Sequence, residues 1–353
     1  MKMLDLEEIM KRKDFSMPLI MGVAIMFFIS SCSKEEIDLG VRNSDNGCAQ
    51  TQVKSEWEWD ESYHPNAGTR SVNESYEFVP VGIKNVYTGM ILKGEELNKG
   101  KMVPITEKAD PLGLVFTVPS FYIGWLQQPN YTSYMREFRN ALQDEDFSGQ
   151  QIEEFEYDLK QFSKYSEMKL AFGANVDICS ILKISGSVES NNIKYKTGLF
   201  ARVCQKNFDA VIDYPDDGNI FSNNAKLSTY PNAAYINSIT YGRMAIISIE
   251  SDSSYSSVKS AFKVALNLKK VNGEVSMDAQ AKKILQEADI KIWIRGGNGA
   301  DVVKTIAGFD EFANFIVNGG TFSKDVPGQP IFCTANRADD NSAFAVQFDT
   351  DKK

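Results

Sequence analysis

Side chains that could carry out acid–base, nucleophilic or metal chemistry are few in this chain and are widely spaced. His64 is the only histidine, which nearly excludes a histidine-activated nucleophile and a metal site built from several histidines. Residues 94–101 resemble a phosphate-binding loop, but their glycines are one residue too far apart and Met102 stands where a serine or threonine would hold magnesium. The Gly-x-Ser-x-Gly and His-Glu-x-x-His motifs are absent. We therefore predict that the protein is not an enzyme and uses no cofactor or metal.

The N-terminal residues are typical of an export signal. A basic stretch at residues 11–13 precedes an apolar stretch from Met17 to Ile29, and small residues then lead to Cys32. The apolar stretch is too short to span a bilayer as a helix. This arrangement resembles the bacterial lipoprotein signal, in which Cys32 would carry the lipid and become the mature N-terminus. Residues 33–36 are similar to the sorting tag of surface lipoproteins in Bacteroides-like bacteria, so we expect an exported outer-membrane lipoprotein exposed at the cell surface.

The rest of the chain divides into a tether and a folded body. We predict a signal peptide over residues 1–31, a lipidated tether over residues 32–75, which are polar and poor in aliphatic side chains, and one body over residues 76–353. The formal net charge is -9 and no basic stripe with interleaved aromatic side chains is present, so nucleic acid is not an expected partner. The other cysteines lack Cys-x-x-Cys spacing, and we assign no disulfide among Cys48, Cys179, Cys204 and Cys333.

Residues 258–282 have two periodicities at once. At strand period they have one apolar and one polar face, and Asn272-Gly273 suits a two-residue hairpin turn that pairs Val271 with Glu274. Each arm is about ten residues long, which is enough for a tilted strand to cross a bilayer. At helical period the same residues would form two amphipathic helices, so the segment could be a helix pair in water and a hairpin in lipid. The apolar face of the hairpin would contain Val258, Phe262, Val264, Leu266 and Leu268 in one arm and Val275, Met277 and Ala279 in the other.

An earlier segment, residues 170–188, alternates in the same way. A three-residue loop at residues 179–181 would keep the apolar side chains of both arms on one face. An antiparallel sheet that is packed on one side also alternates, so each segment alone leaves both interpretations open. The apolar face would contain Leu170, Phe172, Val176, Ile178, Leu182, Ile184 and Val188.

The elements that would position these two segments are mostly strands. We predict central strands over residues 198–212, 239–250 and 291–294, a helix over residues 310–317, and a further strand over residues 343–348. A helix is also predicted before the earlier segment, because apolar side chains recur there at helical intervals: Ile152, Phe155, Leu159 and Phe162.

The residues around the later segment resemble the cholesterol-dependent cytolysins, also called thiol-activated cytolysins. Tyr241, Gly242 and Arg243 lie in the run Ile-Thr-Tyr-Gly-Arg, which is similar to the Val-Ala-Tyr-Gly-Arg strand of that family. In the family this strand runs into the second membrane-inserting segment. Here it is followed by a loop rich in acidic residues and serine, and then by residues 258–262, which resemble the Ala-Ala-Phe core of that segment.

Further similarities occur in the same order as in the family. Residues 86–92 resemble its Ile-Tyr-Pro-Gly-Ala-Leu-Leu motif, although Thr88 replaces the proline. Residues 292–297 are similar to its strand that ends in a glycine pair, and residues 321–331 to the end of its pore-forming body. The resemblance extends from about residue 86 to residue 349.

The resemblance implies an α+β fold with a bent central antiparallel sheet flanked by two helical clusters, each of which can convert to a transmembrane β-hairpin. It places Gly296 and Gly297 at a backbone bend that must yield as the sheet opens, although glycine would equally suit a turn from strand to helix. The cytolysins continue into a membrane-binding domain that recognises cholesterol. This chain stops at Lys353, so we expect the pore-forming body without that domain, and cholesterol binding is not carried over.

The leading hypothesis is a pore-forming protein that oligomerises through its central sheet and inserts both segments into a target membrane. Its expected partners are membrane lipid, further copies of itself, and a second cytolysin-like component that supplies targeting. The alternative is a non-lytic surface protein that uses the same fold for binding or recognition.

Overall fold

The described part of the protein lies within one compact unit, residues 49–353. The computed structural model describes residues 52–58, 72–117, 122–147, 154–184, 191–215, 218–267, 269–271, 274–296, 303–317 and 322–352. None of the helices in these ranges has the length and apolarity that a transmembrane span requires.

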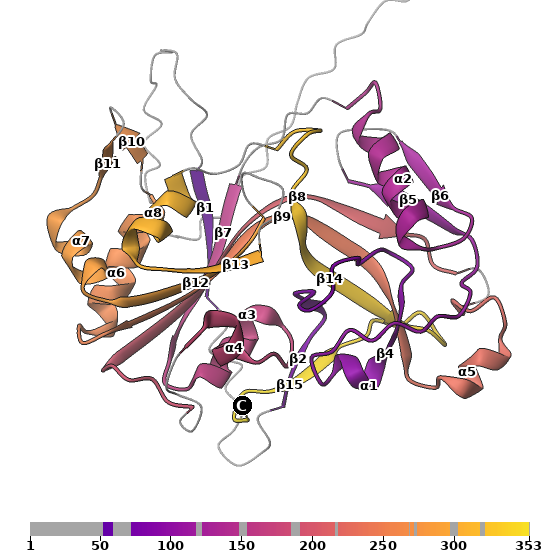
Figure 1. The fold of residues 1–353 in the computed structure, drawn as a ribbon, viewed down its shortest axis with the longest axis horizontal. Helices are drawn as coiled ribbons and strands as arrows, with labels where there is room; N and C mark the ends of the chain where they lie inside the picture. Colours follow the sequence, from indigo (N-terminus) through magenta and orange to yellow (C-terminus); the bar gives the residue numbers. More distant parts are fainter. Residues whose placement is uncertain are drawn as a thin grey trace, which may run out of the picture. The chain divides into compact units, whose positions relative to one another are not determined.

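Two long antiparallel strands, β8 (Thr197–Ile212) and β9 (Ala233–Ser251), organise the fold (Figure 1). Over part of their length they belong to a sheet with the order β1-β7-β8-β9-β12-β13. Its neighbouring strands are antiparallel except for β1 and β7, which are parallel. The other members are β1 (Gln52–Glu58), β7 (Glu154–Phe162), β12 (Asp289–Arg295) and β13 (Val303–Ala307).

The remaining lengths of β8 and β9 pair with a different set of strands. β9 pairs there with β14 (Gln329–Arg337) and β4 (Ile91–Lys93), and β8 pairs with β5 (Leu112–Phe116). Smaller elements complete this part: β2 (Val72–Ser75), β3 (Glu77–Phe78), α1 (Gly94–Leu97), β6 (Ile123–Leu126), α2 (Tyr131–Leu142), α5 (Ala225–Thr229) and β15 (Val346–Asp349).

Each face of the β7-β8-β9-β12 sheet is covered by its own helices, as Figure 1 shows. The first core contains Phe200 and Ile246 from the sheet and is covered by η1 (Tyr165–Met168), α3 (Lys169–Phe172) and α4 (Ile178–Leu182). The second core contains Ala201 and Ile247 and is covered by α6 (Tyr255–Leu266), α7 (Ala279–Gln286) and α8 (Phe309–Val317). Since successive residues of a strand point to opposite faces, β8 and β9 supply apolar side chains to both cores.

The predicted α+β class is correct, and so are the central strands and the helix near residues 310–317. The predicted helix over residues 152–162 is wrong, because β7 occupies most of that range. Leu159 and Phe162 lie in different cores, as strand residues of opposite parity must, and pairing with β8 overrides their helical spacing. Two strands, β1 and β2, lie within the range predicted as a tether.

Candidate functional site

The earlier segment, residues 165–189, connects β7 to β8, and its described residues, 165–184, contain η1, α3 and α4. Local sequence explains why these helices are short. Gly173 ends α3 with φ of 60°, and Lys183 ends α4 with φ of 54°. Asp177 caps α4, because its carboxylate accepts a hydrogen bond from the Ser180 amide at 3.1 Å. We call residues 165–189 the first segment.

The predicted apolar face of the first segment packs into the first core as helix. Phe172, Val176, Ile178 and Leu182 are buried, while Leu170 and Ile184 are half-buried. Val188 lies outside the described residues.

Specific contacts hold the first segment on the sheet. The rings of Phe172 and Trp293 have centroids 5.2 Å apart. The Tyr165 hydroxyl donates to Glu250 Oε1 at 2.6 Å, and the Thr305 hydroxyl donates to the Ile181 carbonyl at 2.6 Å. Burial, reinforced by the Glu250 carboxylate, raises the pKa of Tyr165, so its hydroxyl remains a donor.

The later segment, residues 257–282, connects β9 to β12 and is mainly two helices, α6 and α7. Between them, β10 (Lys269–Val271) and β11 (Glu274–Ser276) form a short antiparallel hairpin. The predicted pairing of Val271 with Glu274 is confirmed. We call residues 257–282 the second segment.

The buried side chains of the second segment are those expected if it forms amphipathic helices. Val258, Phe262 and Leu266 are buried against the second core, whereas Val264 is exposed on the outside of α6. Met277 is half-buried and Ala279 is exposed, and Val275 belongs to β11. The predicted face residue Leu268 and the turn residues Asn272 and Gly273 lie outside the described residues.

The motif Tyr241, Gly242 and Arg243 lies where β8 and β9 shift register, between Lys206 and Phe208. Tyr241 is buried and its hydroxyl accepts from the Tyr134 hydroxyl at 3.0 Å. Arg243 is buried, and its Nε donates to Gln205 Oε1 at 2.6 Å and its Nη1 to the Phe315 carbonyl at 3.0 Å. This motif therefore lies at the junction between the two parts of β8 and β9 that pair with different sets of strands.

Gly296 directly follows β12 and packs against Gly242 and Arg243 of the same motif. Its φ is 78°, and a Cβ atom on it would lie 2.6 Å from the Gly242 carbonyl oxygen, so both conformation and space require glycine. The next described element is strand β13, which pairs with β12. Gly297 lies outside the described residues, so both interpretations of the glycine pair stay predictions.

The register of β7 and β8 agrees with the hairpin predicted for the first segment. Phe162 lies opposite Gly198. Continued without a shift, this register would place Ile178 opposite Leu182 and Val176 opposite Ile184, with residues 179–181 as the loop. Even-numbered residues of both strands, such as Phe162 and Phe200, face the first core. The predicted apolar side chains are also even-numbered, so they would stay on that face.

The second segment would extend β9 and β12 onto the same face. Continuing the β9–β12 register would place Leu268 opposite Val271, whereas β10 and β11 place Val271 opposite Glu274. The offset is an even number of residues, so it does not change which side chains share a face. Both predicted hairpins would thus have their apolar side chains on the first-core face of one extended sheet.

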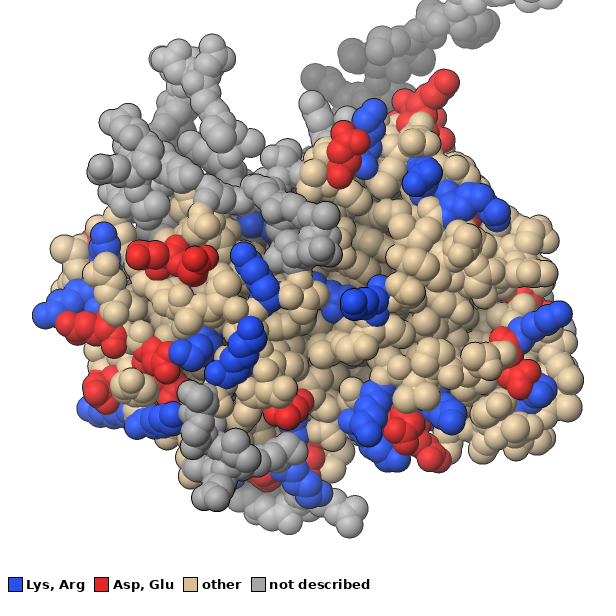
Figure 2. Space-filling model, viewed as in Figure 1, with Lys and Arg blue, Asp and Glu red and all other residues tan. Residues whose placement is uncertain are grey.

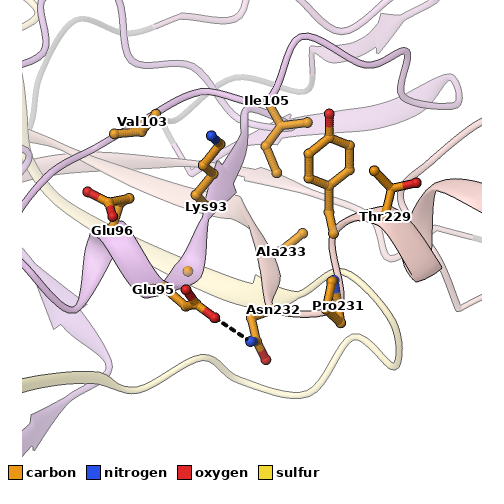
Figure 3. Close-up of a pocket in the computed structure, with 11 residues that line it drawn as sticks. Lys93, Glu95, Glu96, Val103, Ile105, Thr229, Pro231, Asn232 and Ala233 are labelled. Carbon is orange, nitrogen blue, oxygen red and sulfur yellow. Dashed lines mark hydrogen bonds between the residues drawn. The ribbon is translucent and has the colours of Figure 1, made fainter.

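Other parts of the described surface offer little for catalysis. A pocket of about 490 Å³ lies beside α1 and the turn before β9, where Asn232 Nδ2 donates to Glu95 Oε1 at 2.9 Å (Figure 3). Its charged side chains, Lys93, Glu95 and Glu96, are exposed or half-buried. Figure 2 shows acidic and basic side chains interspersed over the described part of one face, which is typical of a solvated surface.

The buried thiols are also poor candidates for chemistry. Burial raises the pKa of the Cys204 and Cys333 thiols to about 12, so both stay protonated at neutral pH.

Sequence reasoning missed one buried charge in the first segment. Lys169 has the parity of the polar face of the predicted hairpin, but its side chain is only 1% exposed in α3. Burial lowers the pKa of its ammonium group. Its main-chain acceptors at Asp349 and Lys352 are distant in sequence, and no local pattern predicts such a contact.

The comparison with known families agrees with this geometry. Residues 201–352 match the family model described as thiol-activated cytolysin. Over this range the chain is similar to the thiol-activated cytolysins. Tetanolysin from Clostridium tetani is 34% identical over 119 residues, a match that covers 33% of this chain and 22% of tetanolysin. Listeriolysin O from Listeria monocytogenes is 32% identical over 115 residues, or 32% of this chain and 21% of listeriolysin O. The chain thus spans about one fifth of these cytolysins.

Solved cytolysins share the fold. A non-hemolytic pneumolysin from Streptococcus pneumoniae superposes with a TM-score of 0.64 at 21% identity, covering 78% of this chain and 62% of that one. Suilysin from Streptococcus suis gives a TM-score of 0.63 at 21% identity, covering 79% and 63%. The expected cytolysin-like α+β fold is confirmed. The expectation that the protein is not an enzyme is also confirmed, since the cytolysins are pore-forming toxins.

Proposed function

We propose that this protein forms pores, by inserting the first and second segments into a target membrane as two β-hairpins per subunit. The observation that carries the proposal is the continuity of parity, because the apolar side chains of both segments keep the face that the strands beside them set. Each segment connects two strands that already pair, β7 with β8 and β9 with β12. Extending both pairs would create four adjacent strands with one apolar face and one polar face, as a transmembrane barrel needs.

Assembly with other copies would satisfy the main-chain groups at the edges of the inserted strands. Four strands per subunit leave two open edges, and unpaired main-chain groups are very unfavourable in lipid. A ring of copies would pair these edges and close one barrel. Membrane lipid and further copies of the chain are therefore its proposed partners.

We further propose that the protein is exported and held at the outer membrane by a lipid on Cys32, exposed at the cell surface. A second cytolysin-like component would supply targeting. These proposals rest on the N-terminal sequence, with its short apolar stretch before Cys32. Mass spectrometry of the mature N-terminal peptide tests the lipid, because an unmodified or uncleaved residue 32 would contradict it.

An environment-sensitive fluorophore on single cysteines, introduced after the native cysteines are replaced, tests insertion. Val176 and Ile178 share the predicted lipid-facing parity, while Asp177 and Lys183 have the opposite parity. With liposomes and candidate partner proteins, labels at Val176→Cys and Ile178→Cys should move into an apolar environment, while labels at Asp177→Cys and Lys183→Cys should stay aqueous. Dye leakage should accompany the change.

Equal responses at both parities, or helices that persist on membranes without leakage, would contradict insertion. That outcome would favour the non-lytic alternative, in which the same fold serves binding or recognition at the cell surface.

A further inference from the structure

The buried ammonium group of Lys169 joins the first segment to a distant part of the chain. Its Nζ donates to Asn175 Oδ1 at 2.6 Å, to the Asp349 carbonyl at 3.0 Å and to the Lys352 carbonyl at 2.6 Å. Two of these three acceptors belong to residues 349–352, which we call the C-terminal latch. The first segment is therefore held by main-chain atoms that are separate from the sheet beneath it.

Other contacts place the latch against the same helices. The Ser166 hydroxyl, which is buried, donates to the Thr350 carbonyl, and Lys164 Nζ lies 3.2 Å from Asp351 Oδ1. On its other side the latch begins with Asp349, the last residue of β15, which pairs with β2, and Thr350 Oγ1 accepts from Asn73 at 3.1 Å. The latch thus bridges the β2–β15 pair and the first segment.

Because Lys169 is a buried ammonium group, the stability of the helical first segment depends on the acceptors that the latch supplies. A charge in the protein interior is tolerated only with good hydrogen-bond partners, and removing its partners is strongly unfavourable. If the latch moved away, Lys169 would retain only Asn175 among the acceptors described above. In the extended sheet Lys169 has the parity of the polar face, where water would solvate it. Its charge therefore favours the helical form while the latch is in place and opposes that form when the latch is gone.

We propose that residues 349–352 are a release latch for the first segment, and that Lys169 is the positioning residue through which displacement of the latch destabilises η1, α3 and α4. The contacts between the latch and the first segment do not depend on whether the protein forms pores. The role of the latch in insertion rests on the function proposed above.

A double-mutant cycle tests the latch. Residues 349–352 are deleted from the otherwise complete chain, with Lys169 intact or replaced in Lys169→Met, and hydrogen exchange of residues 165–182 is measured by mass spectrometry. With Lys169 the deletion should raise local opening by at least about tenfold, because the buried charge loses its carbonyls. In the Lys169→Met background the rise should be no more than about threefold, because the two changes remove one shared interaction. Lys183→Met, which replaces an exposed lysine in the same segment, should behave like the unsubstituted chain.

Equal rises in both backgrounds would overturn the proposal, because the latch would then act by packing alone. If the deletion prevents folding, the proposal is tested instead on the full-length chain, through the effect of a Lys169 substitution on hydrogen exchange of the latch. Lys169→Met should raise exchange of the Thr350 to Lys352 amides by about tenfold, since coupling between two groups is mutual, and Lys183→Met should not. Unchanged exchange in Lys169→Met would also overturn the latch.

Leakage of dye from liposomes separates this proposal from the proposed function. If the deletion raises exchange more with Lys169 than with Lys169→Met, but no condition produces leakage, pore formation is contradicted and the latch is supported. Leakage by the unsubstituted chain, together with equal rises in the cycle, would overturn the latch and leave pore formation standing.

Discussion

Gly100 lies where the loop after α1 meets the first segment. Its φ is 74°, and a Cβ atom there would lie 1.8 Å from the Asn175 carbonyl oxygen. Asn175 in turn accepts from Lys169, so this contact supports the loop that helps to satisfy the buried charge. Gly82 offers a comparison, because its φ is 79° but a Cβ atom added there would have no atom within 4 Å.

The substitution Gly100→Ala should destabilise the protein much more than Gly82→Ala. Both carry the strain of a left-handed backbone, about 1–2 kcal/mol, and Gly100→Ala adds overpacking of about 1–3 kcal/mol. Urea unfolding at fixed pH measures the difference, and hydrogen exchange should show the extra loss in residues 169–182. Equal losses for the two variants would mean that the loop moves aside without cost.

At the scale of elements, the two segments are short helices whose stability comes from packing. Helices as short as α3, α4 and α7 are not stable alone in water, so each depends on the core beneath it. The same side chains alternate at strand period, which means that a different environment can favour a different structure. Val264 distinguishes the two states, because it is exposed on α6 but belongs to the predicted lipid-facing set.

The substitution Val264→Lys should separate the two states. In the helical form the change lies on the surface and should alter the unfolding free energy by no more than about 0.5 kcal/mol. In a barrel a lipid-facing lysine is unfavourable by about 2–4 kcal/mol near the bilayer centre, so leakage should fall by at least about tenfold.

The matched control for Val264→Lys is Asn267→Lys, which adds the same charge to an exposed residue of opposite parity at the C-terminal end of α6. Its leakage should stay within about threefold of the unsubstituted chain. Comparable leakage from both variants would show that Val264 does not face lipid.

For the whole molecule, charged side chains join the layer of β3 and β14 to the central sheet. Arg202 on β8 is paired with Asp158 on β7 at 2.7 Å and lies 3.9 Å from Glu77 on β3. Its guanidinium also lies 4.9 Å from the centre of the Phe332 ring on β14. Burial raises the pKa of the Asp158 carboxyl, and Arg202 partly opposes this rise.

Removing the cation in Arg202→Met should destabilise the protein by about 3–5 kcal/mol at pH 7, because a buried carboxylate loses its partner. The pKa of Asp158 should rise further above its unfolded value of about 3.9. The contribution of a group with a raised pKa is fully present below the unfolded pKa and is lost as pH rises through the folded pKa. The difference from the unsubstituted chain should therefore be smallest near pH 4 and grow toward pH 7 in urea unfolding.

The double variant Arg202→Met with Asp158→Asn should recover most of that loss at pH 7, because it leaves no unpaired charge. A loss that is the same at pH 4 and pH 7 would assign the role of Arg202 to packing against Phe332.

Much of the fold could be predicted because its signals are local. The strand-forming stretches of β8 and β9, the pairing of Val271 with Glu274 and the motif order depend on residues close together in the chain. Other features could not be predicted in this way. Residues 154–162 have helical spacing but form β7, because β8 supplies its hydrogen bonds, and α2 was not predicted although Asn130 and Ser133 form its capping box.

The sequence by itself determined which side chains share a face in each segment, since parity is a property of spacing alone. Only the tertiary structure decided that both segments are helical here, and that their apolar faces would continue one face of a single sheet. It also decided that Lys169 is buried under carbonyl groups about 180 residues away. The physical reason is that burial and main-chain pairing between distant residues depend on how the chain packs, and local spacing carries no record of that.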